Sequence, residues 1–246
     1  MNEIDVLAIF AHPDDVELTV GGTLLKMKSL GYKTGALDIT KGEMGTRGTV
    51  EGRAAEAAEA AQIMKLDVRE NLELPDGHVW VNEETRTELV RVLRRLKPKI
   101  LLTHQADDPH PDHNHIVQLV REAARLCSMQ KYDGDFGQAR ITAPIVAHNI
   151  FSQRVTPSFI VDISEFIAAK TEAIRAHKSQ FYNPNASADE LETRLTSEGF
   201  IDELENRSRY FGSLIGVAAG EPFFVREALN VEDPIALLTR PMNLYS

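Results

Sequence analysis

The 246-residue sequence contains a single cysteine, Cys127, and few aromatic residues, with Phe, Trp and Tyr making up 7% of the chain. One cysteine excludes an intrachain disulfide and a zinc site built from several thiolates, and we interpret Cys127 as a small buried hydrophobe. Long apolar runs are also missing. The first one, residues 6–11, follows Glu3 and Asp5 and is far shorter than the roughly 18 residues that cross a bilayer. We therefore expect a cytoplasmic protein with no membrane partner.

Positive charge is scarce as well. Lys and Arg number 27 against 37 Asp and Glu, which gives a formal net charge of −10. A surface of this sign repels phosphate backbones and argues against nucleic acid as a partner, although a local basic pocket for a small anion is compatible with it. Hydrophobic residues at 43% and charged residues at 26% are ordinary for a globular protein, which excludes disordered and fibrous classes.

Strand-like and helix-like segments alternate in the amino-terminal half. Apolar runs predict strands at 6–10, 33–39, 68–74 and 99–103, each followed by a predicted helix at 16–30, 53–66, 84–96 and 116–126. This alternation predicts an α/β fold of the Rossmann-like, three-layer kind, with a mostly parallel sheet and helices on both faces. We also predict strands at 145–149 and 159–161 and helices at 164–179 and 189–197. No linker or change of composition divides the chain, so we interpret residues 1–246 as one domain.

Two of the loops that follow predicted strands concentrate chemically active side chains. In the first, His12 and Asp15 lie three residues apart and can face one point, while Asp14 must point elsewhere. In the second, residues 107–115, His110 and His113 repeat this spacing, and a window of twelve residues holds four of the eight histidines: His104, His110, His113 and His115. Because the carboxyl ends of parallel strands meet at one edge of a sheet, we expect the two loops to lie together there.

Imidazole and carboxylate ligands suit zinc or another divalent first-row metal. A catalytic zinc takes three protein ligands and leaves one position for a water whose pKa falls toward about 7. Four residues compete for three places, and spacing alone does not exclude one of them: His12, Asp15, His110 and His113. A spare carboxylate beside such a water would act as general base, and a spare imidazolium would stabilise an oxyanion or protonate a leaving amine. Asp112 could orient His110 and favour its charged form.

A third loop, residues 41–48, should open on the same edge. Its glycines would allow a ligand to approach the backbone closely, and Arg47 and Arg53 offer planar guanidinium groups for a carboxylate or for hydroxyls. The loop matches neither a P-loop nor a dinucleotide-binding fingerprint. We interpret His78 and Trp80 as surface and packing residues, and leave open whether His177 reaches a substrate.

Four motifs occur in a fixed order along the amino-terminal half: Ala11-His12-Pro13-Asp14-Asp15, Gly21-Gly22, Gly42-Glu43-x-Gly-x-Arg47 and His110-Pro111-Asp112-His113. With them the sequence resembles the LmbE/PIG-L family of zinc-dependent N-acetylglucosaminyl deacetylases. The carboxyl-terminal half resembles that family more loosely. Its segments at 177–180 and 221–223 are similar to the bacillithiol-pathway branch, whose substrate is N-acetylglucosaminyl-malate.

The resemblance implies a role for each candidate residue. It implies one zinc ion per chain, and that three residues hold it: His12, Asp15 and His113. It further implies Asp14 as general base, and His110, supported by Asp112, as the acid or oxyanion stabiliser. Substrate contacts are expected from the third loop and the helix after it: Glu43, Arg47 and Arg53. The implied partner is a small N-acetylated amino sugar, and the implied assembly is a homo-oligomer, with a hexamer as one arrangement. A tyrosine that assists the transition state in some relatives has no counterpart that we can place.

Two other functions are compatible with the same residues. One is a metal-dependent phosphoesterase, which would hold two metals about 3.5–4 Å apart and cradle phosphate in the glycine-rich loop. The other is a non-catalytic, nucleotide-type binding module with structural histidines. Two equivalents of metal per chain would favour the first, and a purified protein without metal would favour the second.

Overall fold

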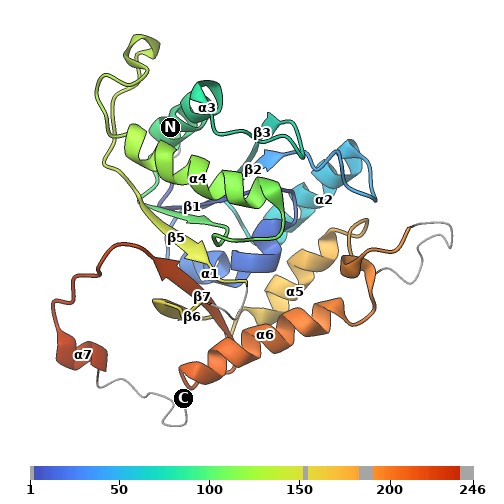
Figure 1. The fold of residues 1–246 in the computed structure, drawn as a ribbon. Coiled ribbons are helices and arrows are strands. Elements are labelled where there is room, and N and C mark those ends of the chain that lie inside the picture. Colours follow the sequence, from blue (N-terminus) through green and yellow to red (C-terminus); the bar gives the residue numbers. More distant parts are fainter. Residues whose placement is uncertain (1–2, 152–154, 183–190, 239–246) are drawn as a thin grey trace.

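The computed structural model describes residues 3–151, 155–182 and 191–238. Within them, seven strands form one sheet: β1 (Val6–Phe10), β2 (Thr34–Thr40), β3 (Val68–Leu74), β4 (Ile100–Thr103), β5 (Ile145–Asn149), β6 (Phe159–Asp162) and β7 (Gly220–Val225). Their order across the sheet is β3-β2-β1-β4-β5-β7-β6 (Figure 1). The first five in this order run parallel, and β7 is antiparallel to both of its neighbours.

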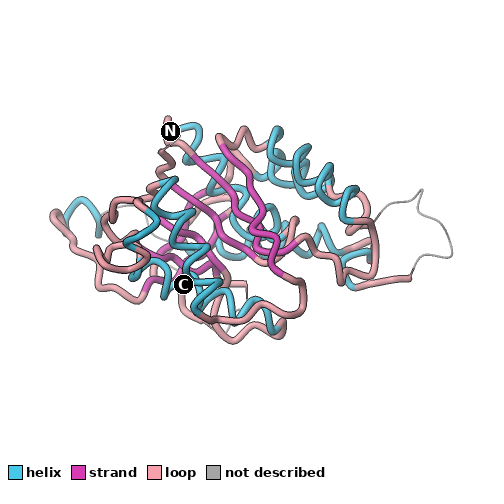
Figure 2. Tube along the Cα trace, turned by 90° about the horizontal axis from the view of Figure 1, so that it is seen from above, coloured by secondary structure: helices cyan, strands magenta, loops and turns pink. Residues whose placement is uncertain are grey.

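Helices cover both faces of the sheet. One face carries α1 (Asp15–Ser29), α2 (Val50–Ile63) and α5 (Ile167–Ala176), and the other carries α3 (Glu83–Leu96) and α4 (Pro111–Leu126) (Figure 1). Seen from above in Figure 2, helices lie on both sides of the strands. The fully buried strand β1 supplies both cores, because alternate side chains of a strand point to opposite faces. Leu7 and Ile9 pack with α3 and α4, whereas Val6, Ala8 and Phe10 pack with α1, α2 and α5. The predicted three-layer α/β fold with a mostly parallel sheet is confirmed.

Most predicted elements of the amino-terminal half lie within a few residues of the observed ones. The start of α4 is the exception that matters for the site, because this helix begins at Pro111 and not at residue 116. The ring Nδ1 of His110 accepts the Asp112 N–H and caps the helix, and Pro111 suits the first turn, where its missing N–H costs nothing. His113 therefore projects from a rigid helical turn and not from a loop.

The carboxyl-terminal third departs further from the prediction. The helix predicted at 189–197 is wrong where it can be followed: residues 191–193 are irregular, Arg194–Thr196 form a single 3₁₀ turn (η2), and 189–190 lie outside the described residues. Leu191 is exposed, so this segment has no continuous apolar face to bury. The prediction also missed β7 and α6 (Phe200–Leu214). Two short helical pieces complete the chain, η1 (Gly134–Phe136) and α7 (Pro234–Leu238), and no helix in the described part is long and apolar enough to cross a membrane.

Candidate active site

The loops that follow β1, β2, β3 and β4 surround a cavity of about 660 Å³, a size typical of small-molecule sites. Nearly all the predicted site residues line it, and these are His12, Asp14, Asp15, Arg47, Arg53, His110 and His113. Glu43 and Asp112 do not. The two histidine loops therefore meet at the carboxyl edge of the parallel strands, as predicted from the topology.

Three side-chain atoms in this cavity are spaced as ligands of one metal ion. His12 Nδ1 lies 3.2 Å from Asp15 Oδ2, and His113 Nε2 lies 3.5 Å from His12 Nδ1 and 3.6 Å from Asp15 Oδ2. Ligands about 2.0–2.1 Å from a tetrahedral zinc are separated by roughly 3.3 Å. The donor set His12, Asp15 and His113 thus fits the ion that the family resemblance implies.

A carboxylate lies close to the opposite nitrogen of each of the two histidine rings. Asp76 Oδ1 lies 3.0 Å from His12 Nε2, and Asp108 Oδ1 lies 3.0 Å from His113 Nδ1. Such carboxylates fix the orientation of metal-binding histidines and make them more basic. Here they turn His12 Nδ1 and His113 Nε2 toward Asp15. Neither aspartate has a role in the sequence interpretation.

The electrostatics of this cluster favour a cation. Burial disfavours a charged His12, but the hydrogen bonds that its ring donates to the Asp15 and Asp76 carboxylates outweigh burial and raise the pKa of His12 to about 10. Burial likewise opposes the ionised form of Asp15, and the surrounding histidines, His113 first, hold the pKa of that carboxyl well below its usual range. The concentrated negative charge is what a divalent metal would neutralise.

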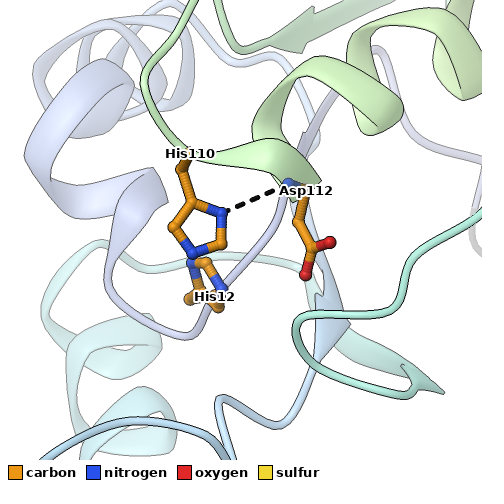
Figure 3. A group of neighbouring side chains, drawn as sticks. All are labelled: His12, His110 and Asp112. Atoms are coloured by element: carbon orange, nitrogen blue, oxygen red, sulfur yellow. Dashed lines mark hydrogen bonds between the residues drawn. The ribbon is translucent and has the colours of Figure 1, made fainter.

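A second donor set contains His12, His110 and Asp112. Figure 3 shows the ring of His110 turned toward His12, with the Asp112 carboxylate beside the two rings and no hydrogen bond drawn from it to either. The ring centroids of His12 and His110 lie 4.9 Å apart. That carboxylate accepts the N–H groups of Gly77 and Val79 at 2.7 and 3.2 Å. Asp112 therefore contacts the His110 ring through its backbone N–H, and not through the carboxylate that the sequence interpretation invoked. Because both sets need His12, the described residues do not provide two separate three-ligand sites.

Asp14 stands apart from both donor sets, at the amino-terminal cap position of α1. Its carboxylate is almost fully buried and lies 3.4 Å from the guanidinium of Arg53. Burial raises the pKa of Asp14, and Arg53 opposes this rise. A buried carboxylate that faces the cavity and is more basic than usual is suited to accept a proton.

The glycine-rich loop makes room for Arg53, and its Gly45 also lines the cavity. Gly42 has a φ of +67°, and a Cβ at this position would lie 2.0 Å from Arg53 Nη1, which donates to the Gly42 carbonyl at 2.8 Å. Arg53 is consequently buried, with its guanidinium between Gly42 and Asp14. Glu43 accepts the Asp76 N–H at 2.8 Å and so supports the turn that carries Asp76. Arg47 lines the cavity, and its carbonyl accepts from Gln180 at 2.7 Å.

Two further histidines are structural. His104 Nε2 accepts the Ala11 N–H at 2.9 Å, and its ring stacks on His113 with centroids 3.8 Å apart. Burial lowers the pKa of His104 to about 3, so it supports His113 as a neutral ring. His177 is fully buried, lies 3.4 Å from Glu17 and does not line the cavity. His177 therefore does not face the cavity in which a substrate would bind.

Comparison with known proteins agrees with this geometry. Residues 7–124 match the model of the PIG-L family, described as GlcNAc-PI de-N-acetylase. Diacetylchitobiose deacetylase of Thermococcus kodakarensis is 33% identical over 190 residues, which cover 72% of this chain and 70% of that protein. The chain belongs to the PIG-L family.

Other proteins are similar over most of their length. A conserved protein of Thermus thermophilus superposes with a TM-score of 0.82 at 34% identity, covering 93% of this chain and 97% of that one. A probable N-acetyl-α-D-glucosaminyl L-malate deacetylase of Bacillus anthracis is 28% identical, covering 73% of this chain and 83% of that protein. The prediction of an enzyme that hydrolyses an N-acetyl amide bond is confirmed by the family membership and by these deacetylase relatives.

Proposed function

We propose that this PIG-L protein uses one zinc ion to remove the acetyl group from an N-acetylglucosamine derivative, releasing acetate and a glucosamine. The observation that carries the proposal is the set of three donor atoms, 3.2 to 3.6 Å apart, whose two histidines are each backed by a carboxylate. Relatives named for diacetylchitobiose and for N-acetylglucosaminyl L-malate support an acetamido sugar as the substrate.

In this proposal His12, Asp15 and His113 hold the metal, which supplies the positive charge that polarises the acetamide and acidifies a water. Asp14 takes the proton of the attacking water, since its carboxylate is buried, faces the cavity and is held by Arg53. His110 keeps Nε2 free for the substrate because Nδ1 accepts the Asp112 N–H. With Nδ1 unprotonated, the ring carries its proton on Nε2 and donates a hydrogen bond to the developing oxyanion, and the leaving amine takes the proton that Asp14 received from the water.

For the substrate we propose N-acetylglucosaminyl-malate or a related N-acetylglucosaminide. Arg47 lines the cavity and would contact sugar hydroxyls. Arg53 is bonded to Gly42 and paired with Asp14, so we assign it to holding Asp14 more than to binding the sugar. The single domain, the homo-oligomer and the cytoplasmic location stay predictions from the sequence.

Acetate release from three compounds tests the proposal: N-acetylglucosaminyl-malate, free N-acetylglucosamine and N,N′-diacetylchitobiose. We expect zinc-dependent release from at least one of them and about one equivalent of bound zinc. Asp14→Ala should keep the zinc and lose most turnover, whereas Asp135→Ala, at an exposed position outside the cavity, should match the wild type. No release from any compound would overturn the activity, and full turnover in Asp14→Ala would overturn the role of Asp14.

A further inference from the structure

The cavity is acidic on one side and basic on another. Its lining carboxylates all come from the loops after β1, β3 and β4: Asp14, Asp15, Asp76 and Asp108. The wall contributed by residues 193–207 contains two arginines, Arg194 and Arg207, and no carboxylate. A metal and its water would occupy the acidic side, so the basic wall faces another part of the ligand.

Arg207 differs from the lining arginines Arg53 and Arg194 in having no anionic partner among the described residues. Arg53 lies 3.4 Å from Asp14, and Arg194 lies 3.4 Å from Glu203. The guanidinium of Arg207 instead lies over the ring of Phe151, 3.8 Å from its centroid, and no carboxylate in the described part of the chain forms an ion pair with it. Partial burial lowers the pKa of Arg207, and Arg194 lowers it further. The side chain nevertheless stays charged at neutral pH, because guanidinium pKa values lie far above 7.

The contact with Phe151 explains how Arg207 is held. Phe151 follows β5, and its N–H donates to Gln105, so the ring has a fixed place at the same edge of the sheet as the histidine loops. Stacking compensates part of the cost of removing a cation from water. It also fixes the guanidinium plane and leaves the N–H groups at its rim available for a planar, two-pronged anion.

We propose that Arg207, positioned by Phe151, binds a carboxylate carried by the part of the substrate beyond the acetamido sugar. The cavity then discriminates between anionic and neutral N-acetylglucosaminides, with the reacting acetamide at the acidic side and the carboxylate at the basic wall. This inference rests on the proposed deacetylation. It names a specificity-determining residue in the carboxyl-terminal third, where the sequence motifs do not extend.

Two substrates that differ only in charge test it: N-acetylglucosaminyl-malate and its dimethyl ester. The wild type should prefer the diacid through a lower KM. In Arg207→Gln this preference should fall roughly 10- to 100-fold, the effect of losing a charge-assisted hydrogen bond, and Arg207→Lys should retain part of it. Arg209→Gln is the matched control, because Arg209 lies on the same helix, is exposed and does not line the cavity. It should keep the wild-type preference.

Binding of the diacid to zinc-stripped protein, measured by calorimetry, separates this inference from the proposed function. Weaker binding by Arg207→Gln than by Arg209→Gln supports the subsite even when no compound is turned over. Equal kcat/KM of the wild type for the diacid and its ester would overturn the inference. An equal decrease in kcat/KM for the diacid and for the ester in Arg207→Gln would also overturn the inference, because a merely structural role of Arg207 predicts that result.

Discussion

Replacing Arg69 should cost far more stability than replacing any exposed arginine. Arg69 projects from β3 and pairs with two buried carboxylates, Glu17 of α1 and Asp38 of β2, and its Nε lies 2.9 Å from Asp38 Oδ2. The exposed fractions of these side chains are 8%, 0% and 4%. In Arg69→Met the Asp38 carboxylate would stay buried without its cation, and Glu17 would keep only His177 as a partner. Breaking a buried ion pair on one side costs about 3–5 kcal/mol, and we expect a loss of that size at pH 7.

The matched control is Arg95→Met. Arg95 forms a comparable two-pronged pair with Glu70, but the exposed fractions of these side chains are 45% and 31%. Exposed pairs contribute about 0–1 kcal/mol, so this variant should unfold almost like the wild type. Urea denaturation in the presence of a chelator gives both free energies of unfolding without a contribution from bound metal.

The pH dependence of Arg69→Met gives a second readout. Burial raises the pKa of Asp38 to about 6 even though Arg69 lowers it. A carboxyl whose pKa is raised by folding destabilises the folded state as pH rises from its ordinary value through the raised one. Without Arg69 the pKa of Asp38 rises further. The loss in free energy of unfolding of Arg69→Met relative to the wild type should therefore be largest near pH 7 and decrease toward about pH 5. A deficit no larger than that of Arg95→Met, or one that grows on acidification, would refute this account of the cluster.

Three further outcomes are expected. Asp76→Asn should weaken zinc binding roughly 10- to 100-fold, measured by competition with a chromogenic chelator, while Asp135→Asn should not change it. Gly42→Ala and Gly31→Ala both place a side chain at positive φ, which costs about 1–2 kcal/mol. Only the first also displaces Arg53, so it should lose about 1.5–3 kcal/mol more in denaturation, and equal losses would contradict the packing described. Zinc at about 100 times its Kd should stabilise the protein by about 2.7 kcal/mol, seen as a Tm that rises with zinc concentration and does not rise in His113→Ala.

The meeting of the two histidine loops could be predicted because it depends on local spacing and on topology, whereas the choice of His12, Asp15 and His113 as ligands came from the family resemblance and stays a proposal. His12 and Asp15 are three residues apart at the start of α1, and the Asp15 carboxylate accepts the His12 N–H at 2.9 Å. His113 sits three residues after the cap of α4, and β1 and β4 are adjacent parallel strands. The residues that follow two adjacent parallel strands lie close together at one edge of the sheet. The proximity of the two loops could therefore be predicted without knowing any long-range side-chain contact.

The residues that support this geometry could not be predicted in the same way. Asp76 meets His12 across 64 positions of sequence, and a Pro-Asp-Gly turn has the same composition whether or not it reaches a site. The sequence predicts a substrate contact for Arg53 because its planar guanidinium at a helix start suits a carboxylate or hydroxyls. Its burial depends on the space beside Gly42 and Gly45, where a Cβ would come within 2.0 and 2.8 Å of its guanidinium. Such shape complementarity leaves no periodic signal in the sequence.

The placement of α6 explains why the residues of the proposed reaction can be predicted from sequence motifs, whereas the residue proposed to set substrate preference cannot. Every proposed ligand and proton-transfer residue comes from the amino-terminal half, on loops or first helical turns that the parallel strands position. The basic wall depends on α6 packing through Phe200 and Leu204 against Leu18 of α1 and Ile174 of α5. Apolar contacts of this kind have no recognisable sequence motif, yet they determine the position of Arg207. In our proposal the histidine loops carry out the reaction, and the packing of this one helix determines which sugar derivative the cavity accepts.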